Sequence, residues 1–418
     1  MELPVKYSHT GANVQASRRY NLIVALIALA GFTLVNVDSS FFTGAYLDVM
    51  KYLHLSEKDI GYIYTVSYTI GAILSLFIGA MADHLGRKRT FQIAMIGVAF
   101  GSLLSGVAWS LISLIIFRSL SQASSSAEPI LGQTFVTEEV DPRRRGLWMA
   151  FQQEGYPLGW FIGSLLTWVL LPRIGWRWLF VVGFIPIVLC IFIARYLHEP
   201  PRFEQAKHSR QIHQRSAFRD LFAPEVRRTT ISMSIYGFFV MVGLGSVQLW
   251  MPSLAQSHGV PVNSIAEINS IGTGIGILGY LFSGWLGDKV GRKYAGIYMI
   301  IPGILFALLL AKFGQSFESI TLFYALWWFA YMGQFAGSMA LAAESFPTEA
   351  RGTGMGFVTF LIWLGVAVSG ILSPLFAAHL GINGAYLVLG VIFPVGALVG
   401  LIIKKNVPPG QELIEIGD

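Results

Sequence analysis

The sequence predicts an all-α membrane protein with twelve transmembrane helices in two pseudo-symmetric six-helix halves. Three observations support this fold class: an apolar composition, twelve stretches long enough to cross a bilayer, and two motifs that recur at one spacing. Of the 418 residues, 54% are hydrophobic and only 12% are charged, whereas a soluble domain carries roughly 25% charged residues. The 45 glycines suit close packing between helices in lipid.

The composition also excludes several functional classes. Cys190 is the single cysteine, which excludes intramolecular disulfides and thiolate metal clusters. The sequence shows no metal-ligand spacing of histidines, no Walker-type lysine and no enzymatic triad. The glycines of 272–279 lie inside an apolar stretch with no strand before them, so they indicate helix packing and not a nucleotide loop. We therefore expect no enzyme, no metal and no cofactor.

A helix needs about 20 apolar residues to cross the hydrocarbon core. The first six stretches of this kind are 21–47, 60–82, 91–109, 111–134, 147–170 and 177–197. The last six are 230–255, 268–287, 294–311, 319–343, 354–377 and 383–403. The first stretch follows a polar arm and lacks a small-residue cleavage site, so we do not expect a signal peptide.

The basic residues predict the orientation. With twelve spans both termini lie on one side, and the loops of that side carry 23 of the 29 Lys and Arg, against five in the opposite loops. This bias places both termini in the cytoplasm. The net charge of +6 is thus explained by the orientation in the membrane, and we expect no nucleic-acid partner. Short opposite loops without an Asn-x-Ser/Thr sequon favour a bacterial inner membrane. The predicted parts are an arm (1–20), two halves (21–197 and 230–403), a cytoplasmic linker (198–229) and a tail (404–418).

An internal repeat relates the two halves. Residues 79–88 recur as 284–293 with Gly, Asp, Gly, Arg and Lys in the same places, at an offset of 205. Residues 138–146 and 344–352 each carry a Glu seven residues before an Arg-Gly, at an offset of 206. Two independent motifs with nearly one offset indicate structural duplicates, and parallel six-helix halves are a described transporter architecture.

The recurring G-x-x-x-D-x-x-G-R-K motif is similar to the signature of the major facilitator superfamily, whose 6+6 layout matches the whole chain. Within it, Asp38, Arg118 and the segment 344–352 resemble motifs of the sugar porters. The seventh helix lacks the sugar porters' Gln-Gln pair, and its Trp250-Met-Pro252 looks more like the aromatic-acid and sialate-type proton symporters. Those aromatic-acid symporters carry D-G-x-D on the first helix, where this chain has an acid only at Asp38. The branch stays open between the two.

Four charged residues lie deep inside spans of the first half, where ionisable groups are costly and mark function by default. Asp38 and Arg118 come from antiparallel helices. Burial favours the protonated form of the Asp38 carboxyl group, whereas a nearby Arg118 favours the ionised form. Because these effects oppose each other, Asp38 can load a proton at one face of the membrane and lose it at the other. Alternatively, the two form a permanent ion pair that braces the helices. Arg118 also suits a substrate carboxylate, which its guanidinium fork can bind.

The other two acids are Glu154 and Glu128. We expect Glu154 to be a second proton site or to lie near the substrate, with a cytoplasmic ion pair as the alternative. Glu128 precedes Pro129, which favours a role in a helix kink. The predicted proton-coupling residues are therefore Asp38, Arg118 and Glu154.

The family resemblance implies a cytoplasmic gate of salt bridges between the halves, formed when the outside is open and broken when the inside opens. The gate residues would be Asp83, Arg87, Glu138, Arg145, Asp288, Arg292, Glu344 and Arg351. The predicted substrate-binding residues are Arg118, Gln153, Tyr331, Gln334 and Trp363. Further aromatic and amide residues at suitable depth are Tyr64, Tyr68, Gln152, Trp160, Trp250, Tyr280 and Trp328.

These features predict a secondary transporter that moves a small organic anion, an aromatic acid or a sugar acid, together with protons by alternating access. It would be driven by the proton gradient without a cofactor, and would act as a monomer in the lipid bilayer. Two alternatives stay open: a neutral-sugar/proton symporter, and a proton-coupled exporter of drugs or lipophilic compounds. The exporter is favoured by the glycines and proline of 155–163, which loosely resemble an antiporter motif.

Overall fold

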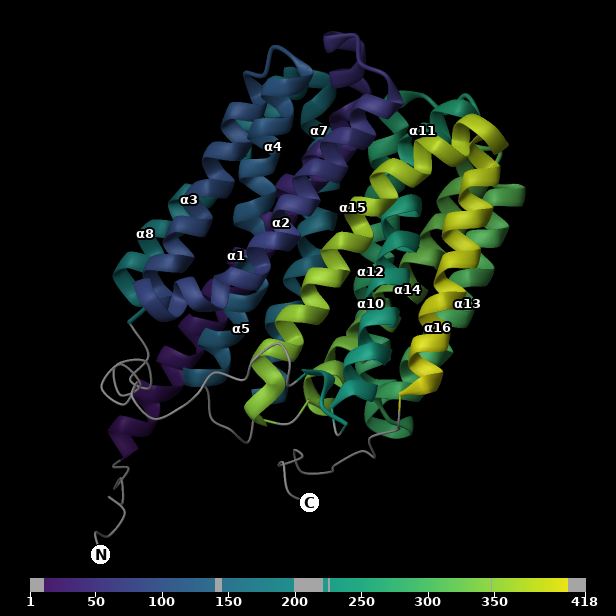
Figure 1. Ribbon diagram of the computed structural model, residues 1–418. Helices are drawn as coiled ribbons and strands as arrows, with labels where there is room; N and C mark the ends of the chain where they lie inside the picture. Colours follow the sequence, from purple (N-terminus) through teal and green to yellow (C-terminus); the bar gives the residue numbers. More distant parts are fainter. Residues whose placement is uncertain (1–10, 140–144, 199–220, 225, 347, 405–418) are drawn as a thin grey trace, which may run out of the picture.

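The computed structural model describes residues 11–139, 145–198, 221–224, 226–346 and 348–404. Long helices run side by side, and the chain enters at α1 and leaves after α16 at the same end of the molecule (Figure 1). We call this end the terminal face and the opposite end the distal face. The predicted arm up to residue 10, most of the predicted linker (199–220) and the tail from 405 lie outside the described residues.

Every predicted span of the first half is helical, but the helix ends differ from the prediction. The helices are α1 (Gly11–Leu53), α2 (Glu57–Leu85), α3 (Arg87–Gly106), α4 (Leu111–Ser125), α5 (Glu128–Glu139), α6 (Arg145–Gln153), α7 (Gly155–Val182) and α8 (Pro186–Tyr196). The fourth span is broken at 126–127 and the fifth at Glu154. The fifth and sixth spans run together as α7, which turns at Gly175.

The second half repeats this pattern. Its helices are α10 (Arg227–Gln248), α11 (Met251–Ser257), α12 (Val262–Val290), α13 (Arg292–Phe313), α14 (Phe317–Ser345), α15 (Thr348–Leu387), the π-helix η3 (Val388–Ile392) and α16 (Phe393–Ile403). The eleventh and twelfth spans run together as α15, which turns at Gly381. Seven segments of the described chain are long and apolar enough to cross a membrane, and two of them, 151–196 and 353–403, each hold two predicted spans.

The repeat is visible in the backbone. Gly86 and Gly291 link a helix pair in each half with φ of 94° and 89°, and Gly175 and Gly381 turn the chain with φ of 74° and 71°. Positive φ is readily adopted only by glycine, which explains the residue type at these four turns. Matching capping boxes also begin α4 at Ser110 and α14 at Ser316. The predicted duplication is confirmed.

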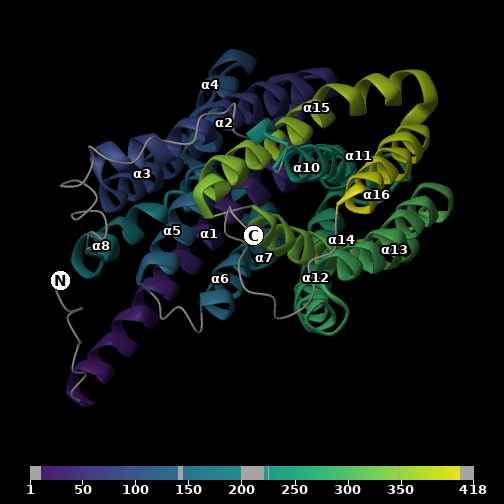
Figure 2. The ribbon, with the colours of Figure 1, turned by 60° about the horizontal axis from the view of Figure 1, so that its bottom comes forward.

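The two halves meet along two helix pairs. Within the first half α1 packs on α7 and α3 on α4, and within the second α14 packs on α12 and α13 while α10 packs on α15 and α16. Between the halves, α2 packs along α15 and α7 along α12, and Figure 2 shows α15 lying beside α2 at the boundary. These two helix pairs form the boundary between the halves.

The contact between α2 and α15 is close enough to bring their backbones together. A Cβ on Gly61 would lie 2.4 Å from the carbonyl oxygen of Gly370. One turn further along, Thr65 Oγ1 donates a hydrogen bond of 2.9 Å to the carbonyl oxygen of Ala367. Both contacts lie in the distal part of α2, so the halves are joined there by main-chain packing.

Replacing Gly61 with alanine should therefore destabilise the protein by about 1–3 kcal/mol, because the new methyl group forces the two helices apart. Thermal unfolding of the detergent-purified protein measures this effect. Gly356→Ala in α15 is the matched control, since a Cβ at that position meets open space. Equal melting temperatures for the two variants would show that the Gly61–Gly370 contact does not hold the halves together.

Candidate functional site

A buried ion pair joins α1 to α4 in the first half. Arg118 Nη1 lies 2.9 Å from Oδ2 and 3.1 Å from Oδ1 of Asp38, and Ser121 Oγ donates a 2.5 Å hydrogen bond to Oδ2. Asp38 is 1% exposed and Arg118 4% exposed. The structure thus brings two of the predicted coupling residues into contact, while their role stays a prediction.

The guanidinium of Arg118 keeps donor capacity beyond this pair. Nη1 alone makes both contacts with Asp38, whereas a fork-to-fork pair would use two nitrogens. Its Cζ lies 4.9 Å from the ring centre of Phe42 and 5.8 Å from that of Phe180, so aromatic faces also stabilise the charge. Tyr68 on α2 lies close enough to interact electrostatically with both members of the pair.

Eight aromatic rings meet between the halves next to this pair, and we call them the aromatic layer. From the first half come Tyr64, Tyr68, Tyr156 and Trp160, and from the second Trp250, Trp328, Phe335 and Trp363. Their ring centres pair across the boundary at 6.3 Å (Tyr64–Trp250), 5.7 Å (Tyr68–Trp363), 5.9 Å (Tyr156–Phe335) and 6.3 Å (Trp160–Trp328). The layer is therefore built equally by both halves.

The indole N–H groups of Trp250 and Trp363 are buried and have no hydrogen-bond partner among the described residues. The indole N–H groups of Trp160 and Trp328 lie beside the hydroxyls of Tyr156 and Tyr324, and the buried amide of Gln248, at the end of α10, also lies beside Tyr156. Buried polar groups are paired in the great majority of cases, so the two unpaired donors call for an acceptor. A ligand with several oxygen atoms would supply one.

The predicted substrate residues fall into three positions. Trp363 belongs to the aromatic layer. Tyr331 stacks on Trp327 with ring centres 5.0 Å apart, and Gln334 on the same helix accepts a short hydrogen bond from the hydroxyl of Tyr236. Gln153 is half-buried in α6.

Tyr156, Phe335 and Gln248 are not among the residues predicted from the sequence. A usable signal existed for the first two. Tyr156 and Trp160 are four residues apart, and Trp328 and Phe335 are seven apart, so each pair shares one helix face. Rings at that spacing on helices from both halves mark a shared boundary. Gln248 had no comparable signal, since its burial depends on how α10 ends.

The two remaining acids of the first half lie at helix breaks. Glu154 sits between α6 and α7, is half-buried, and has one carboxylate oxygen without a partner in the described chain; it is close enough to Tyr280 of α12 to interact electrostatically. Glu128 begins α5 and is fully buried. The helix breaks just before Glu128-Pro129, at the place where the sequence favoured a kink.

The gate prediction is only partly within the described structure. The side chains of Asp83, Glu138, Arg145, Glu344 and Arg351 lie outside the described part, and Arg87 begins α3. Arg292 Nη2 pairs with Asp288 Oδ1 at 2.9 Å, one turn apart in the same half. The expected bridges between the halves therefore stay a prediction.

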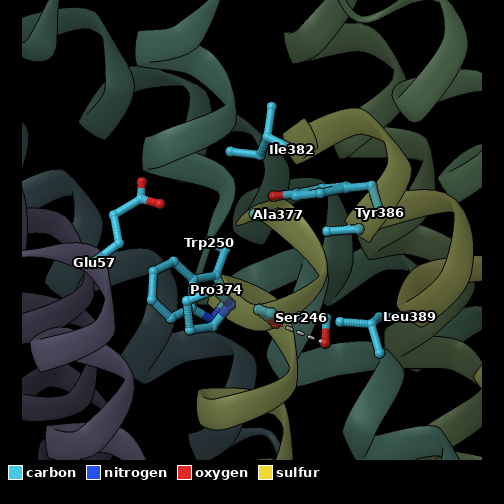
Figure 3. Close-up of a pocket in the computed structure, with 10 residues that line it drawn as sticks. Glu57, Ser246, Trp250, Pro374, Ala377, Ile382, Tyr386 and Leu389 are labelled. Carbon is cyan, nitrogen blue, oxygen red and sulfur yellow. Dashed lines mark hydrogen bonds between the residues drawn. The ribbon is translucent and has the colours of Figure 1, made fainter. Parts of the chain in front are cut away.

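Contacts between the halves close the distal side of the aromatic layer. The Tyr46 hydroxyl lies 2.7 Å from Ser253 Oγ and accepts a 3.0 Å hydrogen bond from the Ser253 backbone N–H. Beyond Trp250 lies a narrow pocket of about 10 Å³ bordered by Glu57, Pro374 and Tyr386 (Figure 3), room for about one water molecule. A ligand in the aromatic layer would thus be sealed from the distal face.

Comparison with known proteins decides the family. Residues 27–316 and 237–416 match the model of the Major Facilitator Superfamily. The chain belongs to this superfamily. It is therefore a multi-pass membrane transporter and not an enzyme, as the recurring loop motif indicated.

Similar proteins within the superfamily come from the branches that the motifs suggested. The cis,cis-muconate transport protein of Acinetobacter baylyi is 25% identical over 392 residues, 92% of this chain and 94% of that one. The sialic acid transporter NanX of Escherichia coli is 27% identical over 380 residues, 87% and 90% of the two chains. Among solved structures, a D-xylose-proton symporter has a TM-score of 0.75 at 19% identity, covering 93% and 98%, which shows a shared fold.

Proposed function

We propose that this protein is a proton-coupled symporter of a small organic anion, an aromatic acid or a sugar acid, across the cytoplasmic membrane. The observation that carries the proposal is the buried Asp38–Arg118 pair next to an aromatic layer with unpaired N–H donors. Charged groups at this depth are costly and are therefore taken to mark function by default. The layer supplies apolar surface and hydrogen-bond donors to the same ligand.

The geometry of the pair supports a coupling mechanism. While Asp38 is ionised, it neutralises Arg118 and competes with an anionic substrate for the guanidinium. When Asp38 takes up a proton, Arg118 loses its counter-charge and can bind the substrate carboxylate through its remaining donors. Proton and anion then occupy the site together, and the net charge of the site is unchanged. Loss of the proton restores the ion pair and expels the anion.

The chemistry of the site supports a carboxylate substrate with an aromatic or hydroxylated body. Arg118 provides a cation, and the indole N–H groups of Trp250 and Trp363 provide neutral donors. The two relatives are named for cis,cis-muconate and sialic acid, both organic anions. Flat rings of the layer would stack on an unsaturated or aromatic body.

The basic loops support an orientation in which the terminal face is cytoplasmic, because that side carries 23 of the 29 Lys and Arg. We place the protein in a bacterial inner membrane as a monomer, with the two halves (21–197 and 230–403) as the moving bodies. The halves would rock about the aromatic layer. Bridges among the gate residues would form at the cytoplasmic side as the distal contacts of Tyr46 break.

Thermal unfolding of the purified protein with candidate ligands tests the substrate class. Aromatic acids and sugar acids should raise the melting temperature. At a ligand concentration 100 times the Kd, binding raises the free energy of unfolding by about 2.7 kcal/mol. The stabilisation should be larger at low pH, because the proposal couples binding of the anion to uptake of a proton at the same site. Stabilisation by neutral sugars or lipophilic cations, with none by carboxylates, would contradict the proposal and favour the sugar symporter or the exporter.

A further inference from the structure

Glu128 is a buried acid that the coupling scheme leaves unused. Its exposed fraction is 0%, and the polar group that faces its carboxylate is the neutral side-chain amide of Gln152. An ionised carboxylate with no counter-charge is expensive away from water, whereas a protonated one is not. Burying the Glu128 carboxyl group therefore destabilises the fold when it is ionised, which suggests that the acid has a function.

The surroundings of Glu128 bring it near the Asp38 helix. A Cβ on Gly31 of α1 would lie 3.2 Å from Oε1 of Glu128. A Cβ on Gly132 would lie 2.8 Å from the same oxygen and 3.0 Å from Nε2 of Gln152. Two glycines and one amide therefore frame the carboxyl group. Gly31 precedes Asp38 by seven residues, so the two share one face of α1 about 10 Å apart.

The carboxyl group lies between Asp38 and the terminal face. Asp38 contacts Arg118 and Ser121 of α4, and Glu128 comes ten residues after Arg118 on the same broken span, about 15 Å nearer the terminal face. Glu154 lies at a similar level, because Gly155 beside it packs against Leu29 and Phe32 of α1. The acids thus descend along α1 from Asp38 to Glu128 and Glu154.

The groups that face Glu128 from packed helices are uncharged. They are Gly31 of α1, Phe91 of α3 and Gln152 of α6. Apart from Asp38, the charged groups of the helices packed against α5 lie toward the ends of those helices: Arg18, Arg19, Asp48 and Lys51 of α1, Glu57, Lys58, Asp59, Asp83 and His84 of α2, Arg87, Lys88 and Arg89 of α3, and Arg145 of α6. Glu154 directly follows α6. The neighbours that the structure describes around the Glu128 carboxyl group are thus apolar groups and the Gln152 amide.

In the second half, the position that corresponds to Glu128 in the repeat is not an acid. Gln334 matches Glu128 at the repeat offset of 206, and Tyr236 matches Gly31 at the offset of 205. There the tyrosine hydroxyl donates a hydrogen bond to the amide oxygen. The fold is therefore compatible with a permanently neutral, hydrogen-bonded side chain at this position, and the first half has instead an acid beside a glycine.

We propose that Glu128 is a proton-relay site that carries protons between Asp38 and the cytoplasmic face. This inference rests on the proposed proton coupling and adds a residue to it. In each cycle Glu128 first releases its proton toward Glu154 and the terminal face. The O–H proton of Asp38 then passes, through water over this distance, to the vacated Glu128 oxygen. Asp38 is left ionised and pairs again with Arg118, so protons and charge balance.

Infrared spectroscopy of the Glu128→Gln variant tests the protonation of Glu128 without any transport. At a pH where exposed carboxylates are ionised, the wild type should show the C=O stretch of protonated carboxyl groups, and the variant should lose the part of this band that comes from Glu128. Glu318→Gln, at an exposed glutamate in the first turn of α14, should leave the band unchanged. A band of unchanged intensity in the Glu128→Gln protein would overturn the proposal.

Transport separates this inference from the proposed function. In proteoliposomes, Glu128→Gln should slow substrate-driven proton uptake by roughly 10²-fold and leave substrate exchange at the wild-type rate. Glu128→Asp, which keeps an acid, should restore part of the proton uptake. Normal proton uptake by Glu128→Gln would overturn the relay alone. A wild type that takes up no protons would overturn the proposed function, while the infrared result would still report on Glu128.

Discussion

Replacing Asp38 with asparagine should abolish accumulation of the substrate against its gradient, while exchange of substrate across the membrane continues. Asparagine has the shape of aspartic acid but takes up no proton, so Arg118 stays free for the anion in every state. For one proton per anion, a gradient of one pH unit should let the wild type accumulate substrate about tenfold. The variant should reach only equal concentrations on the two sides.

Proteoliposomes with an imposed pH gradient and labelled substrate provide this measurement. Asp48→Asn is a suitable control, because Asp48 lies on the same helix ten residues nearer the distal face and is half-buried. The control should accumulate substrate as the wild type does. If Asp38→Asn still concentrates substrate, the coupling proton is carried elsewhere.

Arg118→Gln should lose both substrate affinity and stability. Removing one partner of a buried ion pair typically costs about 3–5 kcal/mol, because the other charge stays buried without compensation. Loss of the guanidinium should also weaken carboxylate binding by roughly 10²-fold, as expected for about 2–3 kcal/mol. Thermal unfolding without ligand and calorimetric titration with the best carboxylate measure the two effects separately.

A double variant separates the two roles of Arg118. Asp38→Asn combined with Arg118→Gln removes both charges, so its stability should return toward that of the wild type while carboxylate binding stays weak. Arg177→Gln is the matched control. It removes a distal arginine that donates a 2.9 Å hydrogen bond to the carbonyl oxygen of Gly106, away from the aromatic layer. Unchanged carboxylate affinity in Arg118→Gln would exclude this residue as the anion-binding group.

The sequence predicted those parts of the fold that depend on composition and repetition. Apolar stretches alone locate the twelve spans, and matching glycines such as Gly86 and Gly291 reveal the duplicated halves. The Asp38–Arg118 contact was also predictable, because few charges lie within the spans and opposite charges away from water seek each other. These features require no knowledge of how one helix is rotated against another.

The contacts within the site could not be predicted from the sequence, because they depend on how each helix is rotated against its neighbours. Whether Trp250 meets Tyr64, or Gln152 faces Glu128, depends on helix rotation and register, which apolar periodicity in lipid barely encodes. The helix break at Glu154 is equally hidden, since the apolar stretch continues through it, whereas Glu128-Pro129 did indicate the break at 126–127. The gate predictions stay open because most of those side chains lie outside the described structure.

Symport requires that a proton moves with the substrate in the same direction. Its most direct test is a proteoliposome experiment with a pH-sensitive dye inside and no initial pH gradient. Adding a carboxylate substrate outside should acidify the lumen in wild-type vesicles and leave it unchanged in Asp38→Asn vesicles. Substrate uptake without acidification, or with alkalinisation of the lumen, would contradict symport and point to uniport or exchange.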